Sequence, residues 1–135
     1  MVTYDSGANR HYISKKDQRK AGLPILRPST QKVRVANGGT SNAKYITQQL
    51  PFRQLSAQSR QADTFQDFPN SLMSVGKTAD EGTVSVFTKD GINVFKEEDI
   101  LITCKNKPIL IGVRDGHGRY QLPLMQQRGQ WQPRR

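Results

Sequence analysis

Residues 2–8 read Val2-Thr3-Tyr4-Asp5-Ser6-Gly7-Ala8, and the interpretation of the whole chain depends on this stretch. Asp5 is its only group suited to acid–base chemistry, and Ser6 offers a hydroxyl for hydrogen bonding beside it. Gly7 permits a tight turn that brings a backbone N–H close to the carboxylate. The same residues also fit a plain Asp-Ser-Gly turn without chemistry. Taken alone, the stretch leaves both interpretations open.

The length and composition limit what the chain can be. A chain of 135 residues is one ordinary domain, or a small domain followed by a tail. The hydrophobic fraction of 34% predicts a small core with long polar connections. Cys104 is the single cysteine, which excludes an internal disulfide and a cysteine-rich zinc site. The histidines, His11 and His117, are far apart, and we expect both to be solvated loop residues. We therefore expect no metal and no cofactor.

The sequence predicts a soluble, intracellular chain. No apolar run approaches the length of a membrane span. Asp5 and Arg10 come too early for a signal peptide. The single cysteine fits a reducing compartment. We therefore expect a cytoplasmic location and no membrane partner.

The net charge of +10 is unevenly distributed along the chain. Residues 9–34 hold eight basic side chains against one acidic side chain, and residues 114–135 hold five against one. Such clusters could neutralise phosphates, which makes non-specific nucleic-acid binding one interpretation. A solvated, solubilising surface is an equally good interpretation. No zinc knuckle, helix-turn-helix signature or interleaved aromatic run is present to read bases specifically.

The segment after the Asp5 turn is expected to begin the core. Tyr12 and Ile13 are the expected core contacts. Residues 15–21 are charged and compatible with a short helix, and Gly22 supplies its stop signal.

A β-hairpin is expected next. Residues 32–36 alternate polar and apolar side chains, as a half-buried strand does. Asn37-Gly38 suits a tight turn, residues 39–42 extend its tip, and residues 43–47 return as the partner strand. Residues 48–64 are rich in Gln, Ser and Arg and predict a surface loop with at most one short strand.

The strongest hairpin signal lies further along. Residues 77–81 can form one helical turn, with Gly82 placed as its C-terminal stop. Residues 84–88 and 92–95 then flank Lys89-Asp90-Gly91, which predicts a second hairpin.

The C-terminal third is expected to add more short strands. Residues 100–104 and 109–113 form a predicted strand pair, and residues 119–124 a further strand after the turn at residues 115–118. Residues 126–135 are Gln, Arg and Pro with one Trp, which predicts a basic, disordered tail. Many short strands and at most two short helices indicate an all-β barrel or sandwich.

Four segments follow one another along the chain. They are Asp5-Ser6-Gly7-Ala8, the glycine-containing hairpin at residues 33–47, Pro69 to Gly76, and Val84 to Gly91. This set resembles the retropepsin-like aspartic protease segment of a copia-type LTR retrotransposon polyprotein, over residues 2–95. Residues 112–124, with Gly118-Arg119-Tyr120-Gln121-Leu122, resemble the linker that precedes integrase in such polyproteins.

The resemblance implies a fold and a division of the chain. Residues 1–95 would be an all-β, closed retropepsin-like barrel with one or two short helices. Residues 96–125 would be a β-hairpin linker, and residues 126–135 the disordered tail.

The resemblance also implies a chemistry and a partner. Asp5, Ser6 and Gly7 would be catalytic, and two carboxylates sharing one proton around a water would hydrolyse a peptide bond. The other candidates for the second acid are Asp80, Asp90 and Asp115. None of them is followed by a hydroxyl residue and then glycine, as Asp5 is. The second acid would therefore be Asp5 of a second copy, in a twofold homodimer. A single chain would be inactive.

Further roles follow from the same resemblance. Ser6 would hydrogen-bond across the dimer, Gly7 would present its N–H to the carboxylates, and residues 72–76 would pack beneath the turn. Ala8, Gly38 and Gly39 would bind the substrate, a polypeptide of the parent polyprotein, with the hairpin at residues 33–47 as a flap. Any surface hairpin would show the same pattern.

Two features depart from the family. Only Met1 to Tyr4 precede Asp5, where the family has a supporting strand, so we expect an N-terminally truncated protease segment. The family's C-terminal dimer strand cannot be identified. Both departures concern dimerisation, and hence activity.

Other classes of function remain open at this point. The chain could be a catalytically inactive β-barrel segment with a structural or assembly role in the polyprotein, in the cytoplasm or within virus-like particles. It could also bind nucleic acid non-specifically through its basic clusters, with steep salt dependence.

Overall fold

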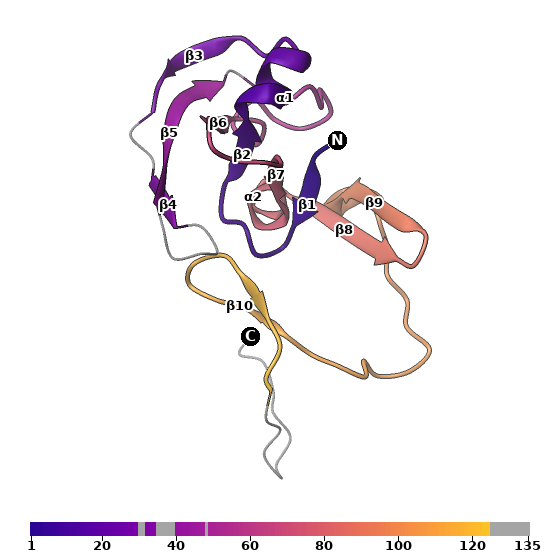
Figure 1. Cartoon of the computed structure of the whole chain (residues 1–135). Helices are drawn as coiled ribbons and strands as arrows, with labels where there is room; N and C mark the ends of the chain where they lie inside the picture. Colours follow the sequence, from indigo (N-terminus) through magenta and orange to yellow (C-terminus); the bar gives the residue numbers. More distant parts are fainter. Residues whose placement is uncertain (30–31, 35–39, 48, 125–135) are drawn as a thin grey trace.

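The central element of the fold is an open, mixed sheet. A computed structural model describes residues 1–29, 32–34, 40–47 and 49–124 (Figure 1). Seven strands pair in one sheet, in the order β1-β7-β2-β6-β5-β3, with β4 attached to β5. Their bounds are β1 (Thr3–Asp5), β2 (His11–Ser14), β3 (Ile25–Pro28), β4 (Lys32–Arg34), β5 (Thr40–Thr47), β6 (Ala62–Phe65) and β7 (Leu72–Ser74). Two short helices, α1 (Lys15–Lys20) and α2 (Val75–Asp80), accompany it.

The expected β-rich fold with few short helices is therefore confirmed, but the expected closed barrel is not. Among the described residues the hydrogen-bonded path runs open from β1 to β3. Closure would need another strand to join these two ends. The next strands along the chain, β8 (Thr83–Thr88) and β9 (Gly91–Lys96), instead pair with each other as a separate two-stranded sheet.

The sheet contains one strand–turn–strand–helix unit twice. The first copy is β1, β2 and α1, and the second is β6, β7 and α2. Each copy contributes its first strand to a parallel pair with the second strand of the other: Asp5 lies opposite Ser74, and Phe65 lies opposite Ser14. Ser14 and Ser74 are sixty residues apart, and so are Asp5 and Phe65. The two copies are thus related by an approximate twofold axis, which passes near the antiparallel pair Tyr12 and Leu72.

Both helices begin and end by the same local chemistry. The hydroxyl oxygen of Ser14 accepts the backbone N–H of Asp17 at 3.1 Å, and that of Ser74 accepts the N–H of Lys77 at 3.0 Å. A serine in this position satisfies one of the free N–H groups of the first helical turn. Gly22 and Gly82 follow the helices with φ of 64° and 83°, a conformation that glycine adopts without strain. The stop signals expected at these two glycines are confirmed.

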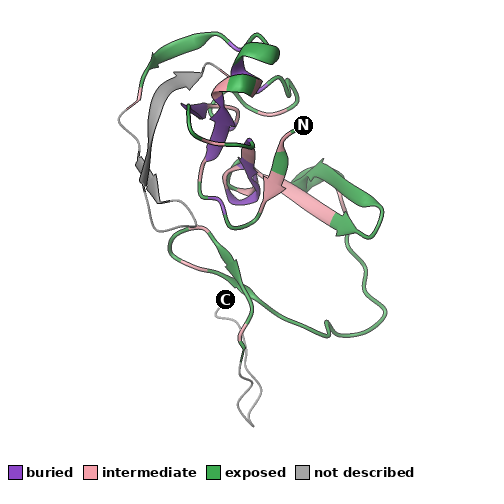
Figure 2. Cartoon of the chain, viewed as in Figure 1, coloured by how far each residue is buried: buried purple, intermediate pink, exposed green. Residues whose placement is uncertain are grey.

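Two small apolar clusters lie against the two repeated units. One consists of Ile13, Leu23, Leu50, Ala62 and Met73, and the other of Ala8, Tyr12 and Phe65 with Phe68 and Leu72 beside them. Figure 2 shows the buried residues concentrated on β2, β6, β7 and α2. Tyr12 and Ile13 are buried, as expected from the sequence.

The expected hairpins are confirmed in two places. β4 and β5 pair antiparallel, with Arg34 opposite Thr40. In the β8–β9 hairpin, Thr83 lies opposite Lys96 and Thr88 lies opposite Gly91, so that Lys89 and Asp90 form the tip. The predicted glycine flap tip, Gly38 and Gly39, lies outside the described residues. The predicted tail at residues 126–135 also lies outside them.

The predicted strand pair at residues 100–104 and 109–113 is wrong. Residues 100–112 contain no regular strand, and they stay exposed except for the partly covered Ile100. The hairpin forms later, between β10 (Val113–Arg114) and β11 (Tyr120–Gln121), across the expected turn at residues 115–118. Isoleucine and leucine at residues 100–112 suggested strands, but here no neighbouring strand pairs with this segment. No helix in the described ranges is long and apolar enough to cross a membrane.

The prediction that His11 is a solvated loop residue is also wrong. His11 is the first residue of β2 and is fully buried. Its Nδ1 accepts the backbone N–H of Ser74 at 2.9 Å, so the neutral ring carries its proton on Nε2 and donates it to the carbonyl oxygen of Ser59. Burial lowers the pKa of His11 from 6.5 to about 4.

This buried histidine makes stability fall in mild acid. The unfolded chain binds a proton at His11 near pH 6.5, whereas the folded chain binds it only near pH 4. The free energy of unfolding should therefore decrease by up to about 3 kcal/mol as the pH falls from 6.5 to 4. Urea unfolding across this range measures the effect. His11→Asn should remove this part of the pH dependence and His117→Asn, at an exposed turn, should not. An unchanged slope in His11→Asn would contradict the assignment.

Candidate active site

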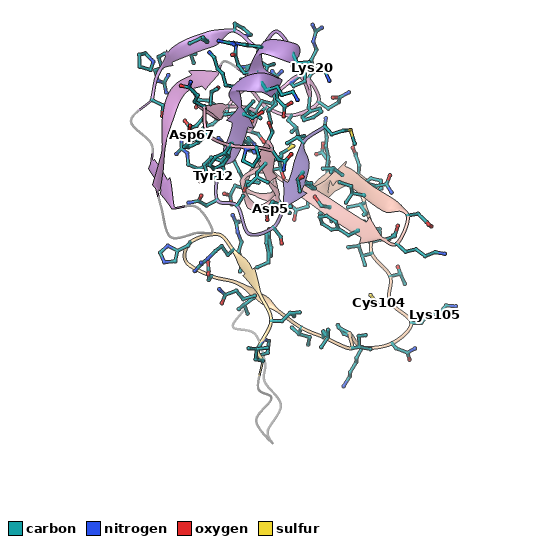
Figure 3. The ribbon with its side chains drawn as sticks, in the orientation of Figure 1. Asp5, Tyr12, Lys20, Asp67, Cys104 and Lys105 are labelled. Carbon is teal, nitrogen blue, oxygen red and sulfur yellow. The ribbon has the colours of Figure 1, made fainter. Side chains whose placement is uncertain are left out.

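The residues predicted to be catalytic form one turn at the end of β1. Figure 3 shows Asp5 at this position. The Oδ1 atom of Asp5 accepts the backbone N–H of Gly7 at 2.7 Å. A Cβ atom at residue 7 would lie 3.3 Å from that same Oδ1, so glycine gives the closest approach without displacing the carboxylate. The N–H contact that the sequence predicted for Gly7 is therefore present. Ser6 is exposed beside it and Ala8 is buried.

A buried serine of the second repeated unit holds this turn. The Ser74 hydroxyl donates to the carbonyl oxygen of Ala8 at 2.6 Å while accepting the N–H of Lys77. Ser74 is fully buried, so both hydrogen bonds are shielded from water. The start of α2 and the Asp5 turn are thus fixed to each other through one hydroxyl group.

Two more side chains anchor the far end of the turn. The Tyr12 hydroxyl donates to the Oδ1 atom of Asn9. Arg10 forms an ion pair with the buried Asp63 on β6, with 2.8 Å between Nε and Oδ2. Because Asp63 is almost completely buried, its charge requires such a partner. Residues 8, 9 and 10 are therefore each fastened to the sheet.

Tyr4 fixes the strand immediately before Asp5. Its hydroxyl lies 2.6 Å from the Oγ1 atom of Thr78 and 2.8 Å from the Oγ atom of Ser85. Thr78 donates its own proton to the Val75 carbonyl at 2.8 Å, so Tyr4 is the donor to Thr78 and the acceptor from Ser85. The Tyr4 ring also stacks on Phe87, with 5.8 Å between centroids. β1, α2 and β8 are joined at this residue.

An open groove of about 530 Å³ lies beside the turn. It is lined by Tyr4, Ser6, Val75, Ala79, Thr83, Val84, Ser85, Phe87 and Tyr120. Six of these side chains are apolar or aromatic, and Ser6, Thr83 and Ser85 add hydroxyl groups. A groove of this kind can hold an extended polypeptide segment with an apolar side chain.

The other carboxylates near the site have their own partners. Asp80 accepts two hydrogen bonds from Arg114, and these lower the pKa of the Asp80 carboxyl. Asp115 accepts the N–H groups of His117 and Arg119, and the bond from Arg119 contributes most to lowering the pKa of Asp115. Asp90 lies at the β8–β9 tip. One chain thus presents Asp5 alone at the turn. Within the described ranges no group of three or more His, Cys, Asp or Glu side chains is placed to hold a metal.

The structure brings together Asp5, Ser6, Gly7 and Ala8, and leaves Gly38 and Gly39 undescribed. Residues 72–76 were expected beneath the turn, and Ser74 of this segment does bond to Ala8. Sequence reasoning missed the roles of Tyr4 and Thr78 and assigned no specific role to Ser74, although a serine recurs directly before each short helix, at Ser14 and Ser74. Comparisons of the chain with protein-family models, with curated proteins and with solved structures found no match.

The two capping serines provide a matched test of how the turn is held. Ser74→Ala removes a helix cap and the bond to Ala8, and Ser14→Ala removes the equivalent cap without touching the turn. Each should lower the free energy of unfolding by about 1 to 2 kcal/mol. Only Ser74→Ala should accelerate hydrogen exchange at the Gly7 amide, measured by NMR. Equal exchange at Gly7 in both variants would show that Ser74 does not position the turn.

Proposed function

We propose that this chain is the retropepsin-like aspartic protease segment of a copia-type LTR retrotransposon polyprotein. One observation carries the proposal: the Asp5 carboxylate, at the end of β1, accepts the Gly7 N–H within a tight turn. Ser74 of the second repeated unit holds this turn through its bond to Ala8. The turn is also held at Ala8, Asn9 and Arg10, as the pre-organised geometry of a catalytic carboxylate requires. The open groove beside Ser6 supports a polypeptide substrate.

The reaction requires two carboxylates, and one chain supplies one. A water molecule between two copies of Asp5 would lose a proton to the ionised carboxylate as it attacks the peptide carbonyl carbon. The protonated carboxyl would polarise the carbonyl oxygen and give it a proton as the C=O π bond opens. The C–N bond would then break, with the leaving nitrogen taking the proton held by the first carboxyl group and the second carboxyl recovering its own. Two carboxylates that share one proton titrate as one unit, because ionising both would place two negative charges side by side. The Gly7 N–H would donate a hydrogen bond to each Asp5 carboxylate and hold its orientation.

The partners follow from this chemistry. The active form would be a twofold homodimer, since a twofold axis places each Asp5 opposite its mate. The substrate would be the polyprotein that contains the chain, within the cytoplasm or a virus-like particle. The exposed basic side chains of α1, Lys16, Arg19 and Lys20, are available for weak contact with nucleic acid in the same particle.

Autoprocessing tests the proposal directly. The polyprotein is expressed with intact Asp5 and with Asp5→Asn, which keeps the side-chain size and removes the acid. The rate at which discrete cleavage fragments form should be about 10² to 10⁴-fold lower in the variant. Asp90→Asn makes the same chemical change at an exposed hairpin tip and should leave cleavage unchanged. Identical fragment patterns for intact Asp5 and Asp5→Asn, in soluble protein, would instead favour a catalytically inactive segment with a structural role.

A further inference from the structure

The β10–β11 hairpin shares two cavities with residues of the Asp5 turn. Tyr120 of β11 lines the same groove as Tyr4 and Ser6. Residues 114–118 line a second open cavity, of about 420 Å³, together with Asn9 and Asp80. Figure 1 shows the hairpin, in the yellow to orange part of the colour scale, next to the indigo loop that follows β1. The hairpin therefore borders the candidate site at Ser6 and at Asn9.

The hairpin packs tightly onto the start of α2. A Cβ atom at Gly76 would lie 2.7 Å from the Nη2 atom of Arg114 and 2.8 Å from the carbonyl oxygen of Gly118. Any side chain at residue 76 would therefore collide with the hairpin, including its backbone. The absence of a side chain at Gly76 allows the hairpin to dock next to Ser74, which holds the turn.

Arg114 is the main polar attachment of the hairpin. Its Nη1 and Nη2 atoms donate to the two carboxylate oxygens of Asp80 at 2.6 Å and 3.3 Å. Its guanidinium group also lies 5.6 Å from the centre of the Tyr120 ring, and its Nε donates to the Gly118 carbonyl at 3.3 Å. Arg114 thus organises the hairpin and fastens it to α2 at once.

This attachment is reversible on physical grounds. The side chains of Arg114 and Asp80 are 33% and 61% exposed, and ion pairs so open to water contribute little to stability. The hairpin has two residue pairs, and the exposed residues 100–112 connect it to the rest of the chain. A small hairpin on a long connection can leave its site without unfolding the sheet.

We infer that the β10–β11 hairpin is an autoinhibitory segment, whose docking on Gly76 and Asp80 blocks the approach of a second copy to Asp5. The inference rests on the proposed function, because only a two-carboxylate site requires a second Asp5 within a few ångströms of the first. A second copy centred on Asp5 would need the surface around Ser6 and Asn9 that the hairpin borders. Release of the hairpin would uncover the dimer face and would remove Tyr120 from the wall of the groove.

A charge reversal and its rescue test this inference. Arg114→Glu places two negative charges opposite each other at residues 80 and 114 and should release the hairpin. The double variant Asp80→Arg with Arg114→Glu should restore docking with the charges exchanged. Lys105→Glu makes the same change in net charge within the exposed connection and is the matched control. The dimer dissociation constant is measured by sedimentation for each variant of the full chain carrying Asp5→Asn, so that self-cleavage does not interfere.

Dimerisation should be tightened by about fivefold or more in Arg114→Glu, and should return toward the starting value in the double variant. Lys105→Glu should leave it unchanged. Weaker or equal dimerisation in Arg114→Glu, or no dimer in any variant, would overturn the inference. A failure of the proposed function is recognised separately, as cleavage of the polyprotein that does not depend on Asp5.

Discussion

The hydroxyl group of Ser74 is the contact on which the rest of this structure depends. It donates to the Ala8 carbonyl and accepts the Lys77 N–H, so one buried oxygen joins the Asp5 turn to the first turn of α2. Next to it, the Ser74 N–H donates to Nδ1 of the buried His11. The geometry of the candidate site is therefore set by the second repeated unit, sixty residues away in the chain.

The twofold repeat explains why a chain with so small a core keeps a defined turn. The N–H of Ser14 donates to the Ser71 hydroxyl, at the positions equivalent to Ser74 and His11. Each unit thus provides a side-chain acceptor for a buried backbone N–H of the other. These hydrogen bonds and the two small apolar clusters together stabilise the fold. The two units should therefore fold cooperatively, because unfolding of one would leave buried N–H groups of the other without a hydrogen-bond acceptor.

Local chemistry could be predicted from the sequence, and long-range pairing could not. The stops at Gly22 and Gly82, the hairpin tip before Gly91 and the tight turn at Gly7 were predicted because each depends on a few neighbouring residues. The repeat was hidden, because residues 3–22 and 63–82 share only the serine and the glycine that cap each helix. His11 was misread for a similar reason: its burial depends on Ser59 and Ser74, which lie far from it in sequence.

The proposed mechanism requires Asp5 from two copies, and a tandem chain with one altered copy tests this requirement. Two copies are joined by a flexible linker, and cleavage of a peptide substrate is compared for the intact tandem and for one with Asp5→Asn in a single copy. One substitution should remove nearly all activity, because the remaining carboxylate has no partner. If the tandem kept half of its activity after the single substitution, each Asp5 would work alone and the two-carboxylate mechanism would be wrong.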